Sequence, residues 1–189
     1  MEDRPPSEAE LVQRARDGDG VAFGALVALH ADVAFRTAYL LLANVTDAED
    51  ATQEAFVKVH RSLARFRDGE PFRPWLLTIV GNTARNRRRT LGRRMALQLR
   101  AEAAEDRARA PSPEAQVLDA ERRRRLLDAI NGLRPDDRLV IGARYFLELS
   151  EAETAALAGV APGTVKSRLS RARARLADAL GERAEWRDD

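Results

Sequence analysis

The chain has 189 residues, an apolar share of 44% and a formal net charge of +2, as expected of a globular protein with one or two small domains. It contains no cysteine and only two histidines, which excludes disulfides, thiolate metal sites and a structural zinc. The charged, proline-containing first residues are unlike a secretory signal, and no apolar run approaches the roughly 20 residues of a membrane span. We therefore expect a cytoplasmic protein without membrane insertion.

The charges are distributed unevenly along the chain. Residues 82–100 contain seven arginines and no acidic residue, and residues 162–176 contain five basic residues and no acidic one. Residues 47–54 instead carry four acidic side chains. Guanidinium groups bind phosphates and base edges, so the two basic segments are compatible with nucleic-acid binding.

Helical periodicity dominates the sequence and the alternation typical of strands is missing, which predicts an all-α fold. A first helix is expected from about Ser7 to Asp17, and a second ends near Ala43. The run Thr46-Asp47-Ala48-Glu49 has the form of a capping box and predicts the start of a third helix. After the loop from Arg67 to Pro71, a long helix is expected to begin near Phe72 and to continue through the first arginine-rich segment.

Each of these last two helices is expected to have one polar and one apolar face. On the third helix, acidic and amide side chains lie opposite an apolar stripe that includes Phe56, and they suit a basic partner protein. On the long helix, a candidate DNA surface is formed by Thr78, Asn82, Arg85 and Arg89. Trp75 lies on the other face with Ile79, so we predict core packing for it rather than base stacking.

A domain boundary is predicted where Pro111-Ser112-Pro113 interrupts any helix. We expect a first domain at residues 1–100, a flexible linker at 101–113 and a second domain at 114–189. Helices in the second domain are expected at roughly 114–131, 135–146, 150–158 and 162–180.

The last two of these helices have the pattern of a helix-turn-helix. Ser150-Glu151-Ala152-Glu153 is a second capping box, Gly159 suits the turn, and Pro162 suits the first position of the final helix. One face of the final helix carries Thr164, Ser167, Arg168, Arg171 and Arg175, with Lys166 off that arc. Another face carries Val165, Leu169, Ala172 and Leu176 and is expected to dock on the preceding helices.

The C-terminal motifs resemble region 4 of extracytoplasmic-function (ECF) sigma factors of bacterial RNA polymerase. The resemblance lies in Leu133-Arg134-Pro135, in the run Ser150 to Ala155, and above all in Gly163-Thr164-Val165-Lys166-Ser167-Arg168-Leu169-Ser170-Arg171-Ala172-Arg173. In that family region 4 reads the minus-35 promoter element. The resemblance therefore implies minus-35 binding by Thr164, Lys166, Ser167, Arg168, Arg171 and Arg175.

The N-terminal motifs resemble region 2 of the same family. Residues 47–56 are similar to its region 2.2, residues 72–82 to region 2.3, and residues 84–89 to region 2.4. The resemblance implies that Asp47, Asp50, Gln53, Glu54 and Phe56 bind core RNA polymerase, where this helix docks on the clamp coiled coil of the largest subunit. It also implies that the chain contacts the polymerase flap. It also implies minus-10 recognition by Arg67, Asp68, Thr78, Asn82, Arg85, Asn86, Arg88 and Arg89, with the loop from Arg67 to Pro71 holding a flipped base.

The sequence thus predicts an alternative sigma factor whose two tethered DNA-reading domains are spaced by the polymerase. Its expected partners are core polymerase, promoter DNA and an anti-sigma protein. We expect no cofactor, metal, catalytic residue or small-molecule substrate, because no phosphate-binding loop, nucleophile elbow or ligand cluster is present. The main alternative is a helix-turn-helix regulator that acts without core polymerase. A nucleic-acid enzyme and a dedicated protein-interaction module explain the motifs less well.

Overall fold

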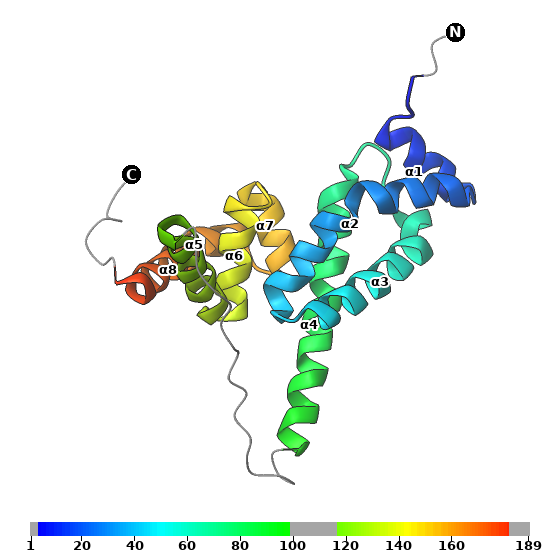
Figure 1. The fold of residues 1–189 in the computed structure, drawn as a ribbon. Coiled ribbons are helices and arrows are strands. Elements are labelled where there is room, and N and C mark those ends of the chain that lie inside the picture. The colour runs from blue at the N-terminus through cyan, green and yellow to red at the C-terminus, as the bar shows by residue number, and fades with distance from the viewer. Residues whose placement is uncertain (1–3, 99–116, 182–189) are drawn as a thin grey trace.

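The structure is a computed structural model that describes residues 4–98 and 117–181. Within these two ranges every regular element is a helix, so the predicted all-α fold is confirmed (Figure 1). The N-terminal half contains α1 (Glu8–Arg16), α2 (Gly20–Leu42), α3 (Val45–Ser62), a short 3-10 helix η1 (Leu63–Arg65) and α4 (Phe72–Gln98). The C-terminal half contains α5 (Val117–Gly132), α6 (Pro135–Tyr145), α7 (Glu151–Ala158) and α8 (Pro162–Leu180). The predicted linker, residues 101–113, lies outside the described residues.

Polar side chains cap the helices of the N-terminal half. At the start of α1, the Ser7 amide donates to the Glu10 carboxylate and the Glu10 amide donates to the Ser7 hydroxyl. At α3 the prediction of a capping box beginning at Thr46 is wrong. The helix begins earlier, and the Asn44 side chain accepts from the Asp47 amide at 3.0 Å. Asn is among the best N-cap residues, so Asn44 takes this position.

Helix α2 is the central element of the N-terminal core. It packs against α1, α3 and α4. Its buried face comprises Ala22, Leu26, His30, Ala34, Thr37, Ala38 and Leu41. Of the described helices, it alone is long and apolar enough to cross a membrane by length and composition, a test that core helices of soluble proteins also pass. Asp32 and Arg36 form an ion pair on its exposed side and interrupt the apolar run.

The C-terminal half forms the predicted helix-turn-helix. The Ser150 amide donates to the Glu153 carboxylate at 2.7 Å and the Glu153 amide donates to Ser150 Oγ at 3.2 Å, which is the predicted capping box of α7. Gly159 ends α7 with a left-handed φ of 66°, which residues with side chains rarely adopt. Pro162 opens α8, and Ala161 before it provides no side-chain cap.

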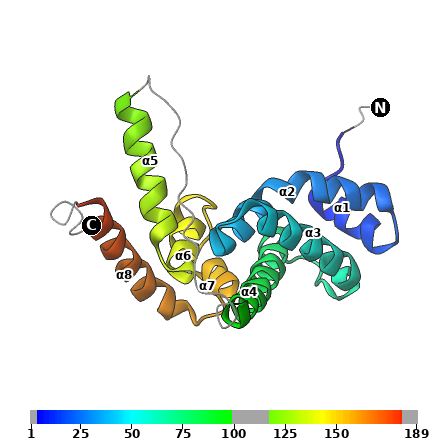
Figure 2. The same ribbon diagram turned by 60° about the horizontal axis from the view of Figure 1, so that its bottom comes forward.

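The two halves pack directly against each other, a contact that the sequence analysis did not anticipate. Helix α6 lies against α2 and α7 lies against α4, as Figures 1 and 2 both show. The approach is closest at two glycines, one from each half. A Cβ atom added at Gly81 would lie 2.6 Å from Leu157 Cδ1, and one added at Gly142 would overlap the side chain of Leu40. Leucines of α6, α7 and the segment between them thereby join the N-terminal core.

Candidate nucleic-acid and polymerase interfaces

The exposed face of α8 is the candidate site for duplex DNA. Its apolar face packs as predicted, with Val165 and Ala172 buried. Lys166, Ser167 and Arg171 are exposed on the other side, where Arg171 Nε donates to the Ser167 carbonyl at 3.1 Å. Thr164 and Arg168 are half-buried, whereas Ser170 is exposed. The accessible arc therefore includes Lys166, which helical geometry alone placed off it, and Ser170, which sequence reasoning missed.

Arg175 has a structural partner that the sequence did not reveal. Its guanidinium pairs with Asp137 of α6, whose side chain is only 8% exposed. Removing one partner of a buried pair leaves an uncompensated charge, which is strongly destabilising. Arg175 therefore holds α8 against α6, in addition to the minus-35 contact that the resemblance implies.

The C-terminal half covers part of the polar face of α4, the candidate minus-10 site. Arg85 Nη1 donates to the Leu157 carbonyl of α7 at 2.7 Å, and Arg85 Nη2 donates to Asn82 Oδ1 at 2.7 Å. Burial lowers the pKa of Arg85; the charge of Asp136 opposes this effect, and Arg88 adds to it. Both ends of the Arg85 guanidinium are thus occupied within the chain.

The remaining polar residues of α4 differ in accessibility. Arg88 pairs with Asp136 of α6 at 3.4 Å, and its Nη1 is buried without a hydrogen-bond partner among the described residues. Asn86 and Arg89 are exposed. Thr78 is half-buried and donates to the Pro74 carbonyl at 2.9 Å. Only part of the predicted minus-10 face is therefore open to a ligand in this arrangement.

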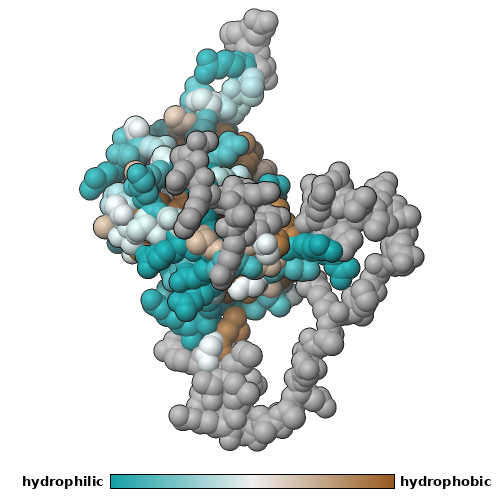
Figure 3. All heavy atoms as spheres, turned by 90° about the vertical axis from the view of Figure 1, so that its left-hand side faces the viewer, coloured by the Kyte–Doolittle hydropathy of each residue, from teal (hydrophilic) through white to brown (hydrophobic). Residues whose placement is uncertain are grey.

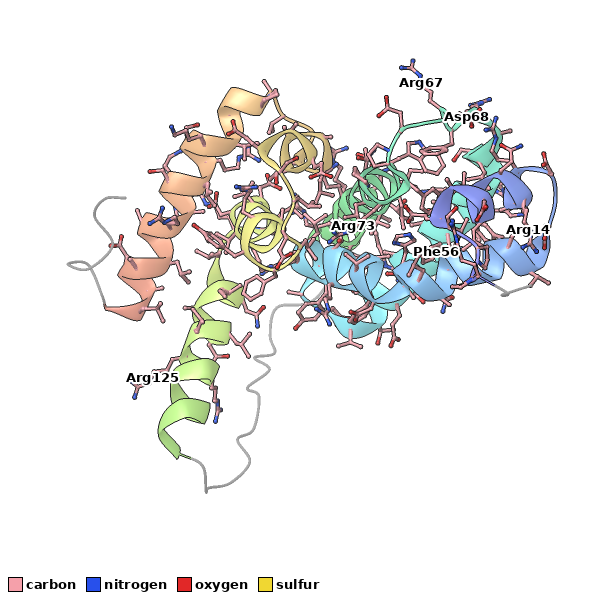
Figure 4. The ribbon with its side chains drawn as sticks, turned by 90° about the horizontal axis from the view of Figure 1, so that it is seen from above. Arg14, Phe56, Arg67, Asp68, Arg73 and Arg125 are labelled. Carbon is pink, nitrogen blue, oxygen red and sulfur yellow. The ribbon has the colours of Figure 1, made fainter. Side chains whose placement is uncertain are left out.

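The loop from Arg67 to Pro71 lies next to an aromatic cluster. The Trp75 ring lies 5.0 Å from Phe66 and 5.7 Å from Phe72, measured between centroids, which supports the packing role for Trp75. Arg67 is exposed and points away from the molecule (Figure 4). Asp68 instead pairs with Arg16 of α1. This ion pair connects α1 to the loop, which the spacing of the residues in the sequence does not indicate.

The predicted polymerase-binding face of α3 is partly neutralised within the chain. Arg87 of α4 donates to Asp47 at 2.9 Å and to Asp50 at 2.6 Å, and the hydrogen bond to Asp47 is the main reason why the pKa of Arg87 is raised. Gln53 is exposed, and Glu54 pairs with Lys58 of the same helix at 2.7 Å. The open part of this face is therefore centred on Gln53 and Glu54.

Phe56 was predicted to touch the polymerase, but its side chain faces inward. It is 8% exposed and belongs to the N-terminal core. Val57 beside it is 49% exposed and borders a shallow hollow with Phe23 and His60. The apolar part of the α3 surface is thus at Val57, one position further along the helix.

An apolar groove of about 520 Å³ lies between α5, α6 and α8. Its mouth exposes Tyr145 and Phe146, at 56% and 55%. The groove is lined by Arg125, Leu126, Ile130, Ile141, Tyr145, Phe146, Arg173, Leu176, Ala177 and Leu180. Figure 3 views the molecule from the side of α5 and α8, where hydrophobic patches interrupt the hydrophilic surface. Exposed aromatic side chains at a groove mark a docking surface for another protein.

Within residues 4–98 and 117–181, no three His, Asp or Glu side chains lie together in a way that could hold a metal ion. The chemistry of the described surface is that of binding, with guanidinium groups on α4 and α8 and an apolar groove on the C-terminal half. These features define a two-domain, all-helical DNA-binding protein with a helix-turn-helix.

Two family models match the chain: Sigma-70 region 2 over residues 26–94 and Sigma-70 region 4 over residues 123–176. Sigma factor CarQ of Myxococcus xanthus is 35% identical over 90% of this chain and 96% of its own length. The ECF sigma-E factor of Haemophilus influenzae is 34% identical over 88% and 92%, and ECF sigma factor SigM of Mycobacterium tuberculosis is 37% identical over 93% and 85%. The chain belongs to the ECF family of RNA polymerase sigma factors.

Solved structures agree with this assignment. CnrH, in complex with the cytosolic domain of CnrY, has a TM-score of 0.66 and 27% identity, covering 94% of this chain and 99% of CnrH. The sigma factor RpoE of Bartonella quintana, in complex with the anti-sigma factor NepR, has a TM-score of 0.65 and 28% identity, covering 84% and 96%. The family match of the N-terminal half also sets aside the alternative of a helix-turn-helix regulator that acts without core polymerase.

Proposed function

We propose that this sigma factor reads the minus-35 element with α8 and the minus-10 element with α4 and the loop from Arg67 to Pro71. One observation carries this proposal: each half presents a polar helix face that bears guanidinium groups, and these faces coincide with regions 4 and 2. On α8, Lys166, Ser167 and Arg171 supply donors for base edges and phosphates in a major groove.

At the minus-10 element, the exposed residues of α4 hold the DNA backbone while the loop receives an unpaired base. Asn86 and Arg89 are open, and Arg67 extends from the loop where it can reach a phosphate. Unstacking a base costs a few kcal/mol, which contacts in the loop must offset. The ion pair between Arg16 and Asp68 limits the motion of the loop and leaves Arg67 free to bind.

Core polymerase binds at two places on this chain. The exposed amide and carboxylate of Gln53 and Glu54 on α3 form the contact for the clamp coiled coil of the largest subunit. The groove between α5, α6 and α8 is the candidate for the second contact, at the flap, because it offers exposed aromatic side chains to an apolar helix. An anti-sigma protein, of the kind present in the RpoE complex, would compete for these surfaces.

Sigma factors are non-enzymatic transcription initiation factors that act in the cytoplasm, and we extend both properties to this chain. No reaction is needed for its function, since specificity arises from two DNA contacts at a fixed spacing on the polymerase. A promoter with only one correctly placed element gains only one contact and is bound weakly.

Run-off transcription with purified core polymerase on a genomic fragment library tests the proposal. We expect new start sites that share two upstream elements at constant spacing. Arg171→Ala should lower their use about tenfold, the effect of one lost base or phosphate contact, and Gln53→Ala with Glu54→Ala should lower core binding. Arg36→Ala, which removes an exposed surface pair on α2, is the matched control. Retardation of duplex DNA without polymerase, and no new starts, would contradict the proposal.

A further inference from the structure

The apolar groove of the C-terminal half has room for an occupant. Helices α5 and α6 both pack against α8 around it (Figure 2). Its volume of about 520 Å³ lies within the range of roughly 300 to 1,000 Å³ that is typical of ligand sites. Leu126, Tyr145 and Phe146 line it and are 39%, 56% and 55% exposed. Because burying side chains of this size is favourable, the groove favours an apolar occupant.

The groove extends along α8 to the last turn of that helix. Its lining residues from α8 are Arg173, Leu176, Ala177 and Leu180, which share one face of the helix. At a rise of 1.5 Å per residue they span about 10 Å of its length. Gly181 then ends α8 with a left-handed φ of 76°, a conformation that turns the chain away from the helix axis. The segment that follows therefore starts at one end of the groove.

That segment, residues 182–189, lies outside the described residues, but its composition complements the groove. It reads Glu-Arg-Ala-Glu-Trp-Arg-Asp-Asp, in which six of the eight residues are charged and Trp186 is the only large apolar one. Four of the charges are negative, whereas Arg125 and Arg173 place guanidinium groups at the groove. A tryptophan buries about 150 to 250 Å² and keeps a polar N–H that can stay in water, which suits a half-open site.

We propose that residues 182–189 dock in the groove of their own chain, with the indole ring of Trp186 in its apolar part and the acidic side chains near Arg125 and Arg173. The segment is long enough. The five residues from Gly181 to Trp186 extend over as much as about 17 Å, more than the length of the groove along α8. Because the segment is tethered, its local concentration is on the order of millimolar, and even a weak contact is populated.

Docking of the segment bears on the partner that was assigned to the groove above. The docked segment and the polymerase flap would exclude each other, since both need the same apolar surface. If the segment fills the groove in about two thirds of the molecules, an external partner binds about threefold more weakly. This consequence rests on the proposed role of the groove as the flap contact, whereas docking of the segment does not.

Acrylamide quenching of Trp186 fluorescence on the full chain tests the docking. Each protein is measured with and without Trp186→Phe, so the difference isolates Trp186 while Trp75 stays in its aromatic cluster. Leu126→Glu places a charge in the groove and should raise the quenching of Trp186 at least about twofold. Leu127→Glu is the matched control, because Leu127 follows directly on α5, is 51% exposed and does not line the groove. It should leave the quenching as in the native chain.

Two comparisons on the native chain complete this test without a substitution in the groove. Trp186 should be quenched less than in a synthetic peptide of residues 182–189, and equally so after dilution of the protein. Quenching as strong as in the peptide would overturn the proposal. So would quenching that Leu126→Glu leaves unchanged, with native helicity by circular dichroism. Protection that is lost on dilution would show that a second copy supplies the segment, and would overturn docking within one chain.

Titration with the isolated flap domain of core polymerase tests the consequence separately. Trp186→Ser should raise the affinity of the full chain for this domain about threefold, because the competing side chain is removed. Ala184→Ser, in the same segment, is the matched control and should have no effect. Protected Trp186 together with an unchanged flap affinity in Trp186→Ser would support the docking and would overturn the assignment of the groove to the flap. The two ideas therefore fail on different measurements.

Discussion

Asp137 and Arg175 show how one side chain can serve the fold while lying next to a DNA-reading face. Asp137 is buried in α6, and its partner Arg175 reaches it from α8. We expect Arg175→Ala to lower the free energy of unfolding by about 2 kcal/mol, because the carboxylate is left without its cation, although partial solvation of Arg175 reduces the penalty. Arg171→Ala, one helical turn away, should change stability by less than about 0.5 kcal/mol.

Chemical denaturation of the two variants, beside duplex DNA binding at fixed salt, separates these roles. Arg171→Ala should weaken DNA binding and leave the free energy of unfolding unchanged. Arg175→Ala should mainly lower the free energy of unfolding. Equal stability of the two proteins would show that Asp137 does not need its partner. The double variant Asp137→Ala with Arg175→Ala should regain part of the loss, since both charges are then removed.

Several binding residues can be recognised from the sequence. Whether their side chains are free to bind a partner cannot. The faces of α4 and α8 follow from spacing, because residues three and four apart share a side of a helix. Spacing within one helix does not predict contacts with another helix. It could not show that Arg87 forms ion pairs with both Asp47 and Asp50. Nor could it show that Arg85 donates a hydrogen bond to the Leu157 carbonyl. These contacts join residues that are tens of positions apart.

At the scale of single elements, the capping box of α7 controls the helix-turn-helix. Ser150→Ala removes the side-chain acceptor of the Glu153 amide and should lower the free energy of unfolding by about 1 kcal/mol, the usual value of an N-cap. Ser170→Ala, an exposed serine inside α8, should cause no loss, since alanine is the better helix former there. Denaturant unfolding of both variants measures the difference, and equal values would contradict the role of the cap.

The same capping box makes the free energy of unfolding depend on pH, in a direction that follows from the pKa of Glu153. Hydrogen bonds from Ser150 lower the pKa of Glu153 below its ordinary 4.5, so the folded chain favours the charged carboxylate. The resulting stability is complete above about pH 4.5 and is lost as the pH falls through the lowered pKa. The difference between the native chain and Glu153→Gln should therefore shrink on acidification. A difference that grew with acid would mean that the carboxylate is held in its protonated form.

The start of α3 shows that a capping residue cannot always be identified from the sequence alone. The run from Thr46 to Glu49 fits the pattern of a capping box, yet Asn44, two residues earlier, is a stronger N-cap than Thr46 and lies where the chain leaves α2. Directly before Asn44, the left-handed conformation of Ala43, with a φ of 52°, ends α2. Nothing in the local pattern indicates that turn at an alanine.

At the scale of the whole molecule, the sequence predicts the fold of each half but does not predict how the two halves pack against each other. The helices of each half follow from hydrophobic periodicity and capping residues. The contact between the halves depends on glycines, and their role can be recognised only when the helix packed against them is known. Gly81 and Gly142 look like weak points within helices until Leu157 and Leu40 are placed against them. Glycine therefore occurs not only in turns but also where two helices approach each other closely.

Leu40 and Gly142 are complementary in size, since the leucine side chain occupies the space in which a Cβ at residue 142 would lie. Gly142→Ala alone should weaken the packing of α6 against α2, because the added methyl group overlaps the Leu40 side chain. Leu40→Ala alone should also weaken this packing, since it removes apolar contact with α6. In the double variant the methyl group occupies space that the leucine has left, so the population of chains with packed halves should exceed the value expected from adding the two single effects. Energy transfer between dyes attached at Ala64→Cys and Ala179→Cys, in a chain that has no cysteine of its own, measures this coupling. Strictly additive effects would mean that the two side chains do not meet and that the halves are held together elsewhere.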